Sequence, residues 1–353
     1  MGLDTAIAGI QSNDMAIWLP LVWAAILGVA VALYVVLDGF DLGLGILFPL
    51  TPAEDDRDVM MNTVAPFWDG NETWLVLGGG GLFVAFPQAY GIIMPAVYLP
   101  IIVMLLALVF RGVAFEFRWV SKPHHWFWDL AFTWGSITAA FMQGVILGAL
   151  LQGVTVKDGA FAGGPLDWLT PFALFCGLAV TAGYALLAAT WLVMKTEGEI
   201  ASQMRGYAKQ LLLVVLVAMA VISIWTPWTI PRIAERWFTV SSGIPVPNLY
   251  LLPVPVLSLI AAAVWWNGLR GRAESTPFFA AIALFLLGYA GLVISNAPYL
   301  VPPSLTVWQA ASPVKSQLFM LYGTAIMLPV ILGYTVFVYY TFRGKMRVGE
   351  GYH

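Results

Sequence analysis

The chain has 353 residues, 60% of them hydrophobic and 10% charged, and its mean hydropathy is +0.85. These values exclude a soluble globular domain and predict a polytopic membrane protein. The formal net charge is −3 and the sequence contains no basic block, so nothing in it indicates a nucleic-acid partner.

The N-terminal residues 1 to 18 contain no basic region and no small-residue cleavage site ahead of a short apolar core. We therefore expect no cleaved signal peptide, and we expect the first span to direct insertion. The single cysteine, Cys176, lies in the apolar run TPFALFCGLAV. It excludes an intrachain disulfide and is simplest to interpret as a small core residue.

Apolar stretches of roughly 20 residues can cross about 30 Å of hydrocarbon. We predict nine such spans, and the second is interrupted by the polar run PFWDGNETW. The turn residues and aromatics of residues 227–248 predict an interfacial loop with a short helix. The predicted spans are residues 16–49, 59–86, 90–115, 126–151, 168–194, 207–227, 250–268, 277–297 and 317–342.

Charge placement gives the expected orientation. Nine spans with the N-terminus on the periplasmic side put twelve Lys and Arg residues in the cytoplasm and four outside, which obeys the positive-inside rule. Omitting the second span puts eleven Lys and Arg residues in the cytoplasm and five outside, so charge does not decide between nine and eight spans. Both counts predict a cytoplasmic C-terminus.

Four carboxylates fall inside predicted spans, as two pairs with i, i+3 spacing that puts each pair on one helix face. Asp38 and Asp41 approach the cytoplasmic boundary at the end of the first span. Asp69 and Glu72 belong to the second span, where Asp69 lies eleven residues after the run EDDRD. In an unbroken helix this separation is on the order of 16 Å, which predicts a position near mid-membrane for Asp69.

A charged group at the centre of a spanning helix costs roughly 2.5 to 3.5 kcal/mol on insertion scales, so these carboxylates need a compensating role. The structural alternative for Asp38 and Asp41 is a polar pair that snorkels or bonds backbone at a helix end, with Gly39 and Gly43 forming a small-residue packing face. The structural alternative for Asp69 and Glu72 is a buried hydrogen-bond network.

Two further acids, Glu116 and Asp129, lie at the inner ends of the third and fourth spans, close to Arg111, Arg118 and Lys122 in sequence. For these two acids ordinary interfacial ion pairing is the simpler interpretation. The functional interpretation of the acids as a group is proton conduction, because a series of carboxyls that are partly neutral can pass protons where bulk ions are excluded.

Histidine is scarce, and intramembrane haem or copper normally needs imidazole ligands. His124 and His125 fall in a predicted cytoplasmic loop and His353 is the last residue, so we expect all three to be solvated. We therefore expect no catalytic residue, metal or other redox centre in this chain.

Two long motifs carry a family resemblance. LDGFDLGLGILFPL at 37–50 and NTVAPFWDGNETWLVLGGGGLFVAFPQAY at 62–90 closely resemble subunit II of the cytochrome bd-type quinol oxidases, and the second is most similar to the cyanide-insensitive branch. FRGVAFEFR at 110–118 is similar to the same family.

The resemblance implies an all-α fold of nine transmembrane helices, arranged as two four-helix bundles and one peripheral helix in a single transmembrane domain. On this sequence the bundles would be residues 16–151 and 168–297, and the peripheral helix would be residues 317–342. It also implies a bacterial inner-membrane terminal oxidase that oxidises quinol and reduces oxygen to water.

In that family the b and d-type haems and the quinol-oxidising loop belong to subunit I, the expected partner. A small single-span accessory subunit and lipids are further partners that the resemblance allows. Some family members also hold a structural quinone in subunit II, for which this sequence has no signature.

The resemblance further implies that subunit II contributes to a proton path from the cytoplasm along the subunit interface. Carried onto this sequence, the path involves Asp69, Trp74 and Glu116. Relatives more often have aspartate at the last position, and glutamate keeps a titratable carboxyl there. Glu72, Asp41 and Asp38 lie nearby and complete the predicted path.

Two alternatives remain open. An ion-coupled secondary transporter would use the Gly- and Pro-interrupted second span as a broken helix with a midplane site, although nine spans and the lack of a clear inverted repeat count against it. A scaffold subunit would only keep a partner's haem face dry by packing.

Overall fold

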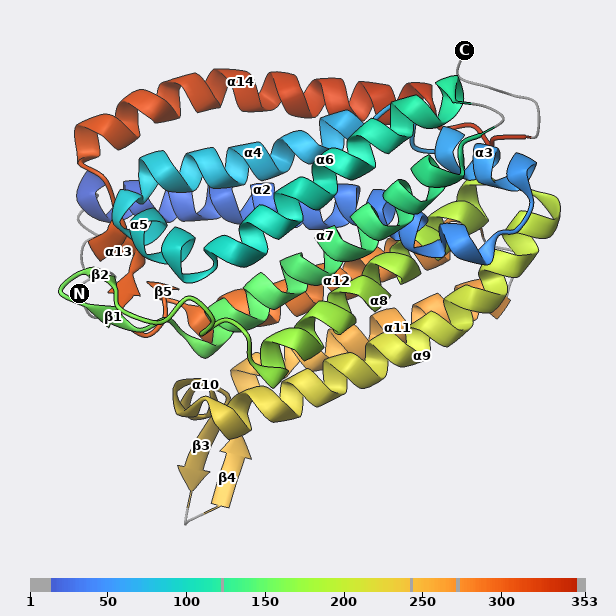
Figure 1. Ribbon diagram of the computed structural model, residues 1–353. Coiled ribbons are helices and arrows are strands. Elements are labelled where there is room, and N and C mark those ends of the chain that lie inside the picture. The colour runs from blue at the N-terminus through green and yellow to red at the C-terminus, as the bar shows by residue number, and fades with distance from the viewer. Residues whose placement is uncertain (1–13, 122–123, 242–243, 271–273, 348–353) are drawn as a thin grey trace.

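The computed structural model describes residues 14–121, 124–241, 244–270 and 274–347 as long helices with short segments at their ends (Figure 1). The expectation about a signal peptide concerns mainly residues 1–13, which lie outside the described residues. His353 and Lys122 lie outside them as well.

Helices dominate the described part of the chain, and three short antiparallel hairpins connect some of them. The longer helices are α2 (Met15–Leu47), α4 (Trp68–Ala85), α6 (Tyr98–Val120), α7 (Trp126–Gln152), α8 (Pro171–Lys195), α9 (Gly198–Thr229), α11 (Pro253–Arg270), α12 (Thr276–Asn296) and α14 (Val314–Thr341). The short helices are η1 (Phe48–Leu50), α3 (Glu54–Asn62), α5 (Pro87–Ala96), α10 (Pro231–Trp237), η2 (Leu249–Leu251) and α13 (Val307–Ala310). The hairpins are β1 (Val156–Lys157) with β2 (Ala160–Phe161), β3 (Phe238–Ser241) with β4 (Ile244–Pro247), and β5 (Tyr299–Val301) with β6 (Leu305–Thr306).

Local sequence explains several helix ends. Asp14 caps α2 by accepting a 2.9 Å hydrogen bond from the backbone N–H of Ala16. Thr170 caps α8 by accepting a 3.1 Å hydrogen bond from the N–H of Ala173, with Pro171 at the first helical position.

Eight of the described helices are long and apolar enough to cross a membrane. Each overlaps one predicted span, so hydropathy located these segments correctly. They are α2 with η1, α6, α7, α8, α9, η2 with α11, α12 and α14. Helix α4, with its polar start WDGNE, is not among the eight.

The second predicted span is wrong as a continuous helix. The chain leaves α3 at Asn62, turns through residues 63–67 and starts α4 at Trp68. Pro66 explains the break, because its ring blocks a helical hydrogen bond and disfavours the preceding helical turn. Asp69 therefore lies in the first turn of α4, and the predicted depth loses its basis because it assumed an unbroken helix.

The third predicted span is also displaced. Residues 87–96 form the separate short helix α5, and α6 continues to Val120. Arg111, Glu116 and Arg118 therefore all lie on one helix.

Helix α2 lies at the centre of the packing. It packs against α4, α7 and α8, and α14 runs lengthwise beside it on the outer side (Figure 1). Helix α6 packs on α7, α7 on α8, α8 on α9, and α11 on α12. Within α14 only Gln317 is buried, so most of that helix faces outward.

Close contact between α2 and α8 depends on the predicted small-residue face. A Cβ atom on Gly43 would overlap the backbone carbonyl of Tyr184, and one on Gly39 would lie 2.8 Å from the Tyr184 ring. The prediction of a packing face at these two glycines is confirmed.

The predicted loop at 227–248 contains the expected short helix, α10. The β3–β4 hairpin that follows it was not predicted, and it projects from the end of the helices opposite α3 (Figure 1).

Candidate functional site

Two carboxylates lie in the interior near the C-terminal end of α2. Asp38 and Asp41 are both fully buried. Asp41 accepts a 2.7 Å hydrogen bond from Nδ2 of Asn71 on α4. The alternative that these carboxylates snorkel to the membrane boundary is wrong, because α4 and α8 pack closely on this part of α2.

A buried guanidinium connects α6 to these carboxylates. Nη1 of Arg111 lies 2.8 Å from Oε1 of Glu72, and Nη2 lies 3.8 Å from Oδ1 of Asp38. The guanidinium carbon stands 5.1 Å from the centre of the Trp68 ring. Because a buried charge is tolerated only with partners, Arg111 holds α2, α4 and α6 in a fixed relation.

We call Asp38, Asp41, Glu72 and Arg111 the Arg111 cluster. It contains three carboxyls and one guanidinium, so full ionisation would leave two uncompensated negative charges. A low-dielectric interior disfavours that state. The cluster is therefore chemically suited to binding and releasing protons.

Several atoms of the Arg111 cluster have no hydrogen-bond partner among the described residues. They are both carboxylate oxygens of Asp38, Oδ1 of Asp41, and Nε and Nη2 of Arg111. Buried polar atoms in native proteins nearly always bind protein groups or ordered water. Atoms in this state are suited to internal water, through which protons can pass between neighbouring carboxyls.

Helix α14 contributes a hydroxyl to the same region. Tyr339 donates a 3.0 Å hydrogen bond to Oδ1 of Asn71. With a donor on Oδ1, the Asn71 amide must turn its Nδ2 toward Asp41, so α14 sets the orientation of this amide. Sequence reasoning missed both Asn71 and Tyr339, because they are separated by most of the chain.

A second hydrogen-bonded series continues from α2 to α8. Nε2 of Gln143 donates to the hydroxyl of Tyr34 at 2.7 Å, and the hydroxyl of Tyr184 donates to Oε1 of Gln143 at 2.6 Å. Tyr34 lies one helical turn before Asp38. This series extends the polar region from the Arg111 cluster to α7 and α8.

A second charge cluster lies where α3 meets the ends of α6 and α7. Arg118 is fully buried, and its Nε lies 2.6 Å from Oδ1 of Asp129. It also pairs with Asp58 on α3, and Nη1 of Arg57 lies 3.1 Å from Oδ2 of Asp129. The predicted ion pairing of Asp129 is confirmed.

His125 belongs to this second cluster. Its Nε2 lies 2.9 Å from Oε1 of Glu54, and its Nδ1 lies 3.3 Å from Oδ2 of Asp129. The prediction that His125 is solvated is wrong, because the chain folds α3 over the start of α7 and buries the ring. Its neighbour His124 is exposed, as predicted.

The structure divides the predicted path residues into two groups. Asp38, Asp41 and Glu72 join the Arg111 cluster, and the buried Trp74 packs with Ala30 and Tyr34 of α2. The remaining two, Asp69 and Glu116, are exposed on the surface of the isolated chain.

Asp69 and Glu116 come from adjacent helices. The rings of Trp68 and Phe115, the residues just before them, stack with centroids 5.1 Å apart. Glu116 pairs with neither Arg111 nor Arg118, because its side chain is exposed whereas theirs are buried, and the third expected partner, Lys122, lies outside the described residues.

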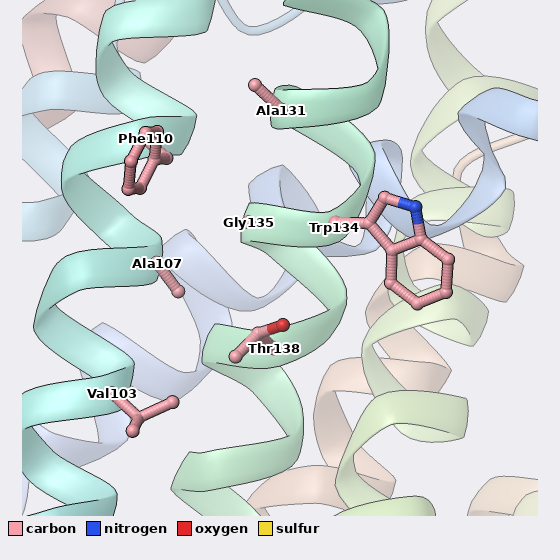
Figure 2. A pocket seen from close by; sticks show the side chains of 7 residues that line it. All are labelled: Val103, Ala107, Phe110, Ala131, Trp134, Gly135 and Thr138. Carbon is pink, nitrogen blue, oxygen red and sulfur yellow. The ribbon is translucent and has the colours of Figure 1, made fainter.

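A shallow groove of about 250 Å³ lies between α6 and α7. Figure 2 shows the side chains that line it, contributed by these two helices. The lining residues are Val103, Ala107, Phe110, Ala131, Trp134, Gly135 and Thr138. None of these lining residues has an acidic or basic side chain.

Comparison with known proteins assigns the family. Residues 19–342 match the family model described as cytochrome bd terminal oxidase subunit II. The chain belongs to this family. It is therefore a subunit of a terminal oxidase, and the resemblance seen in the sequence motifs is confirmed.

Relatives of the subunit II family align with nearly the whole chain. Cytochrome bd-I ubiquinol oxidase subunit 2 of Escherichia coli strain K12 is 29% identical, covering 92% of this chain and 94% of that protein. Cytochrome bd ubiquinol oxidase subunit 2 of Bacillus subtilis strain 168 is also 29% identical, with coverages of 92% and 96%. The bd oxidase structure from Geobacillus thermodenitrificans matches with a TM-score of 0.75 at 15% identity, covering 92% of this chain and 98% of that chain, which indicates a shared fold.

Oxidases of the bd type depend on haem. Among the described residues, no three His, Cys, Asp or Glu side chains come together as a metal site. His125 already contacts a carboxylate with each ring nitrogen, so it does not fit an axial haem ligand. Family membership also favours the oxidase interpretation over the ion-coupled transporter.

Proposed function

We propose that this chain is the haem-free subunit II of a bacterial quinol:oxygen oxidoreductase and supplies a cytoplasmic proton path to a haem site in subunit I. The complex would oxidise quinol and reduce oxygen to water, as the names of the ubiquinol oxidase relatives suggest. The observation that carries the proposal is the Arg111 cluster, a buried group of carboxyls in excess over cations.

The path that we propose passes from the Arg111 cluster to the outer face of α4. Glu72 connects the two parts, because it contacts Arg111 and lies one turn from Asp69 on the same helix. Its side chain is 24% exposed, between the fully buried Asp38 and the surface. Protons would move through the cluster to Asp69 and then to the partner, with Glu116 beside this exit.

Trp74 has a supporting role in this proposal. Its indole is buried in a cluster with Ala30 and Tyr34, against which leucines of α14 pack. This packing holds α4 against α2 and keeps bulk lipid and solvent away from the Arg111 cluster. Trp74 itself does not titrate.

We assign the outer face of α4 to subunit I. Its exposed stripe contains Asp69, Thr73, Val76, Gly80 and Phe83, which recur at helical spacing. Small residues on such a stripe let a neighbouring helix approach closely. A partner on this face would bury Asp69 and give its carboxyl a proton acceptor across the interface.

The proposed fold retains nine spans, with α4 as the additional one, grouped as two four-helix bundles within one transmembrane domain. The outward-facing surface of α14 supports its place as the peripheral helix. We further propose that α3 and the ends of α6 and α7 face the cytoplasm, following the charge bias.

The test is Asp69→Asn in the assembled complex, with the optical spectrum used to verify haem content. We expect normal haem content and oxygen consumption at least tenfold slower, because proton delivery normally contributes 10² to 10⁴-fold where a positioned group carries it. Thr73→Ala, one turn along the same exposed face, is the matched control. Normal oxygen consumption by a fully loaded Asp69→Asn complex would favour the scaffold alternative, and loss of assembly would indicate a structural role for Asp69.

A further inference from the structure

We infer that His125, with Glu54 and Asp129, forms the proton-entry site of this subunit, and that the buried face of α7 connects it to the Arg111 cluster. This inference depends on the proposed proton path and adds its point of entry. No residue of this entry site was among the path residues predicted from the sequence.

The three side chains form a series from surface to interior. The Glu54 side chain is 54% exposed, whereas those of His125 and Asp129 are 11% and 12% exposed. The imidazole stands between the two carboxylates: Nε2 is hydrogen-bonded to Glu54 at 2.9 Å, and Nδ1 lies 3.3 Å from Asp129 but has no hydrogen-bond partner among the described residues. Imidazole exchanges protons near neutral pH and has two nitrogens, so it can take up a proton on one side and release it on the other.

Each helix that packs near His125 contributes charged side chains to its surroundings. Helix α3 contributes Glu54 and Arg57, and α7 contributes Asp129. Helix α6 contributes Arg118, which binds the far oxygen of Asp129. The two arginines hold Asp129 in place, and the two carboxylates face the imidazole directly.

Beyond Asp129, polar side chains continue along the buried face of α7. Thr133 and Ser136 follow at i+4 and i+7 and are buried. Oγ of Ser136 has no hydrogen-bond partner among the described residues. The same helix presents Gln143 two turns farther on, where it bonds Tyr34 and Tyr184.

Ser136 also lies next to the aspartate-bearing part of α2. A Cβ atom on Gly45 would overlap the Ser136 side chain, and Gly45 is one turn beyond Asp41. Asp129, Thr133 and Ser136 are thus about one turn, or 5.4 Å, apart along α7, a gap that a single hydrogen-bonded water bridges. A hydroxyl in this position can relay protons between Asp129 and the Arg111 cluster.

The proton balance of the entry step is simple. A bulk proton binds the exposed carboxylate of Glu54 and passes to Nε2 of His125. The imidazolium then releases its Nδ1 proton toward Asp129. The imidazole returns to its first tautomer when solvent takes the proton from Nε2 and supplies one to Nδ1, so one proton moves inward per cycle with no electron transfer and no other reactant.

The experiment compares His125→Gln with His124→Gln in the purified complex with its haem-bearing partner. Oxygen consumption is measured from about pH 5.5 to 9, where imidazole exchanges protons. We expect His125→Gln to move the alkaline limb of the profile to lower pH, because proton entry then depends directly on the bulk proton concentration. We expect His124→Gln, an exposed neighbour, to match the wild type.

A His125→Gln complex with full haem content and the wild-type pH profile would overturn the inference. If His125→Gln does not assemble, Glu54→Gln decides. A shifted alkaline limb in Glu54→Gln supports the relay, and an unshifted one shows that His125 is structural and overturns the relay. Asp69→Asn in the same assay separates the two proposals. If Asp69→Asn turns over slowly and His125→Gln has the wild-type profile, only the entry site is overturned. If both variants behave like the wild type, the whole path is overturned.

Discussion

Arg111 of α6 and Glu72 of α4 form a salt bridge of 2.8 Å in which the arginine is fully buried and the glutamate is partly exposed. This pair joins the interior carboxylates of α2 to the outer face of α4. Both the stability of the first helices and the proposed proton path therefore depend on one guanidinium.

Replacement of Arg111 by Met should destabilise the protein strongly. Removing one partner of a buried ion pair typically costs about 3 to 5 kcal/mol, because the other charges stay buried without compensation. The measurement is the midpoint of thermal unfolding of the purified complex in detergent. Arg270→Met, at an exposed arginine that lies 4.9 Å from the ring of Trp266, is the control and should change stability by less than about 0.5 kcal/mol. Equal midpoints for the two variants would contradict the assigned role of Arg111.

Tyr339→Phe tests how α14 acts on the interior. The substitution removes the hydroxyl that fixes the Asn71 amide and should cost about 1 kcal/mol of stability. If Asn71 then turns its oxygen toward Asp41, the proposed proton path loses a donor and oxygen consumption should fall several-fold. Tyr340→Phe, on the exposed side of the same helix, should leave stability and oxygen consumption unchanged. A Tyr339→Phe complex with unchanged turnover would show that the hydroxyl has no part in the path.

Gly43→Ala tests the contact between α2 and α8. The added methyl group would overlap the Tyr184 carbonyl, and overpacking of this kind costs about 1 to 3 kcal/mol. Gly206→Ala on α9 has open space around its Cβ position, so the same change there should be neutral or stabilising by up to about 1 kcal/mol. Thermal unfolding of both variants is the measurement. A Gly43→Ala protein with the wild-type unfolding midpoint would mean that α2 and α8 can separate at this point without loss of stability.

Lys195→Gln tests the attachment of α14. Nζ of Lys195 donates to the carbonyl of Phe342 at 2.7 Å and to that of Gly344 at 3.3 Å, and it lies 4.9 Å from the centre of the Trp191 ring. Losing these contacts should loosen the C-terminal end of α14. We expect faster amide hydrogen exchange within the last turns of α14 and unchanged exchange in α9. Unchanged protection of α14 would show that Lys195 does not anchor it.

Hydropathy was enough to locate eight membrane helices, because each is a long apolar segment whose ends carry polar or turn residues. It failed at residues 59–86, where apolar composition hid the turn that Pro66 imposes. The i, i+3 spacing of Asp38 and Asp41 predicted a shared helix face, but the buried partners of that face come from α4 and α6.

The missed residues had weak sequence signals. Arg111 stands in the apolar run MLLALVFRGVAF, and an arginine there requires acidic partners, a signal that an interfacial interpretation overlooked. His125 looked like a loop residue because α3, which covers it, is formed by residues far earlier in the chain. Tyr339 and Asn71 meet only when α14 packs on α4, so no local pattern could predict their contact.

The measurement that tests the central claim most directly is proton uptake from the bulk, followed with a pH-sensitive dye during a single turnover of the assembled complex. In the wild type, proton uptake should keep pace with oxygen reduction. In an Asp69→Asn complex of equal haem content, the rate of proton uptake should be at least tenfold lower than in the wild type and should depend on bulk pH. Uptake in Asp69→Asn at the wild-type rate would contradict the claim that protons reach the partner through this subunit.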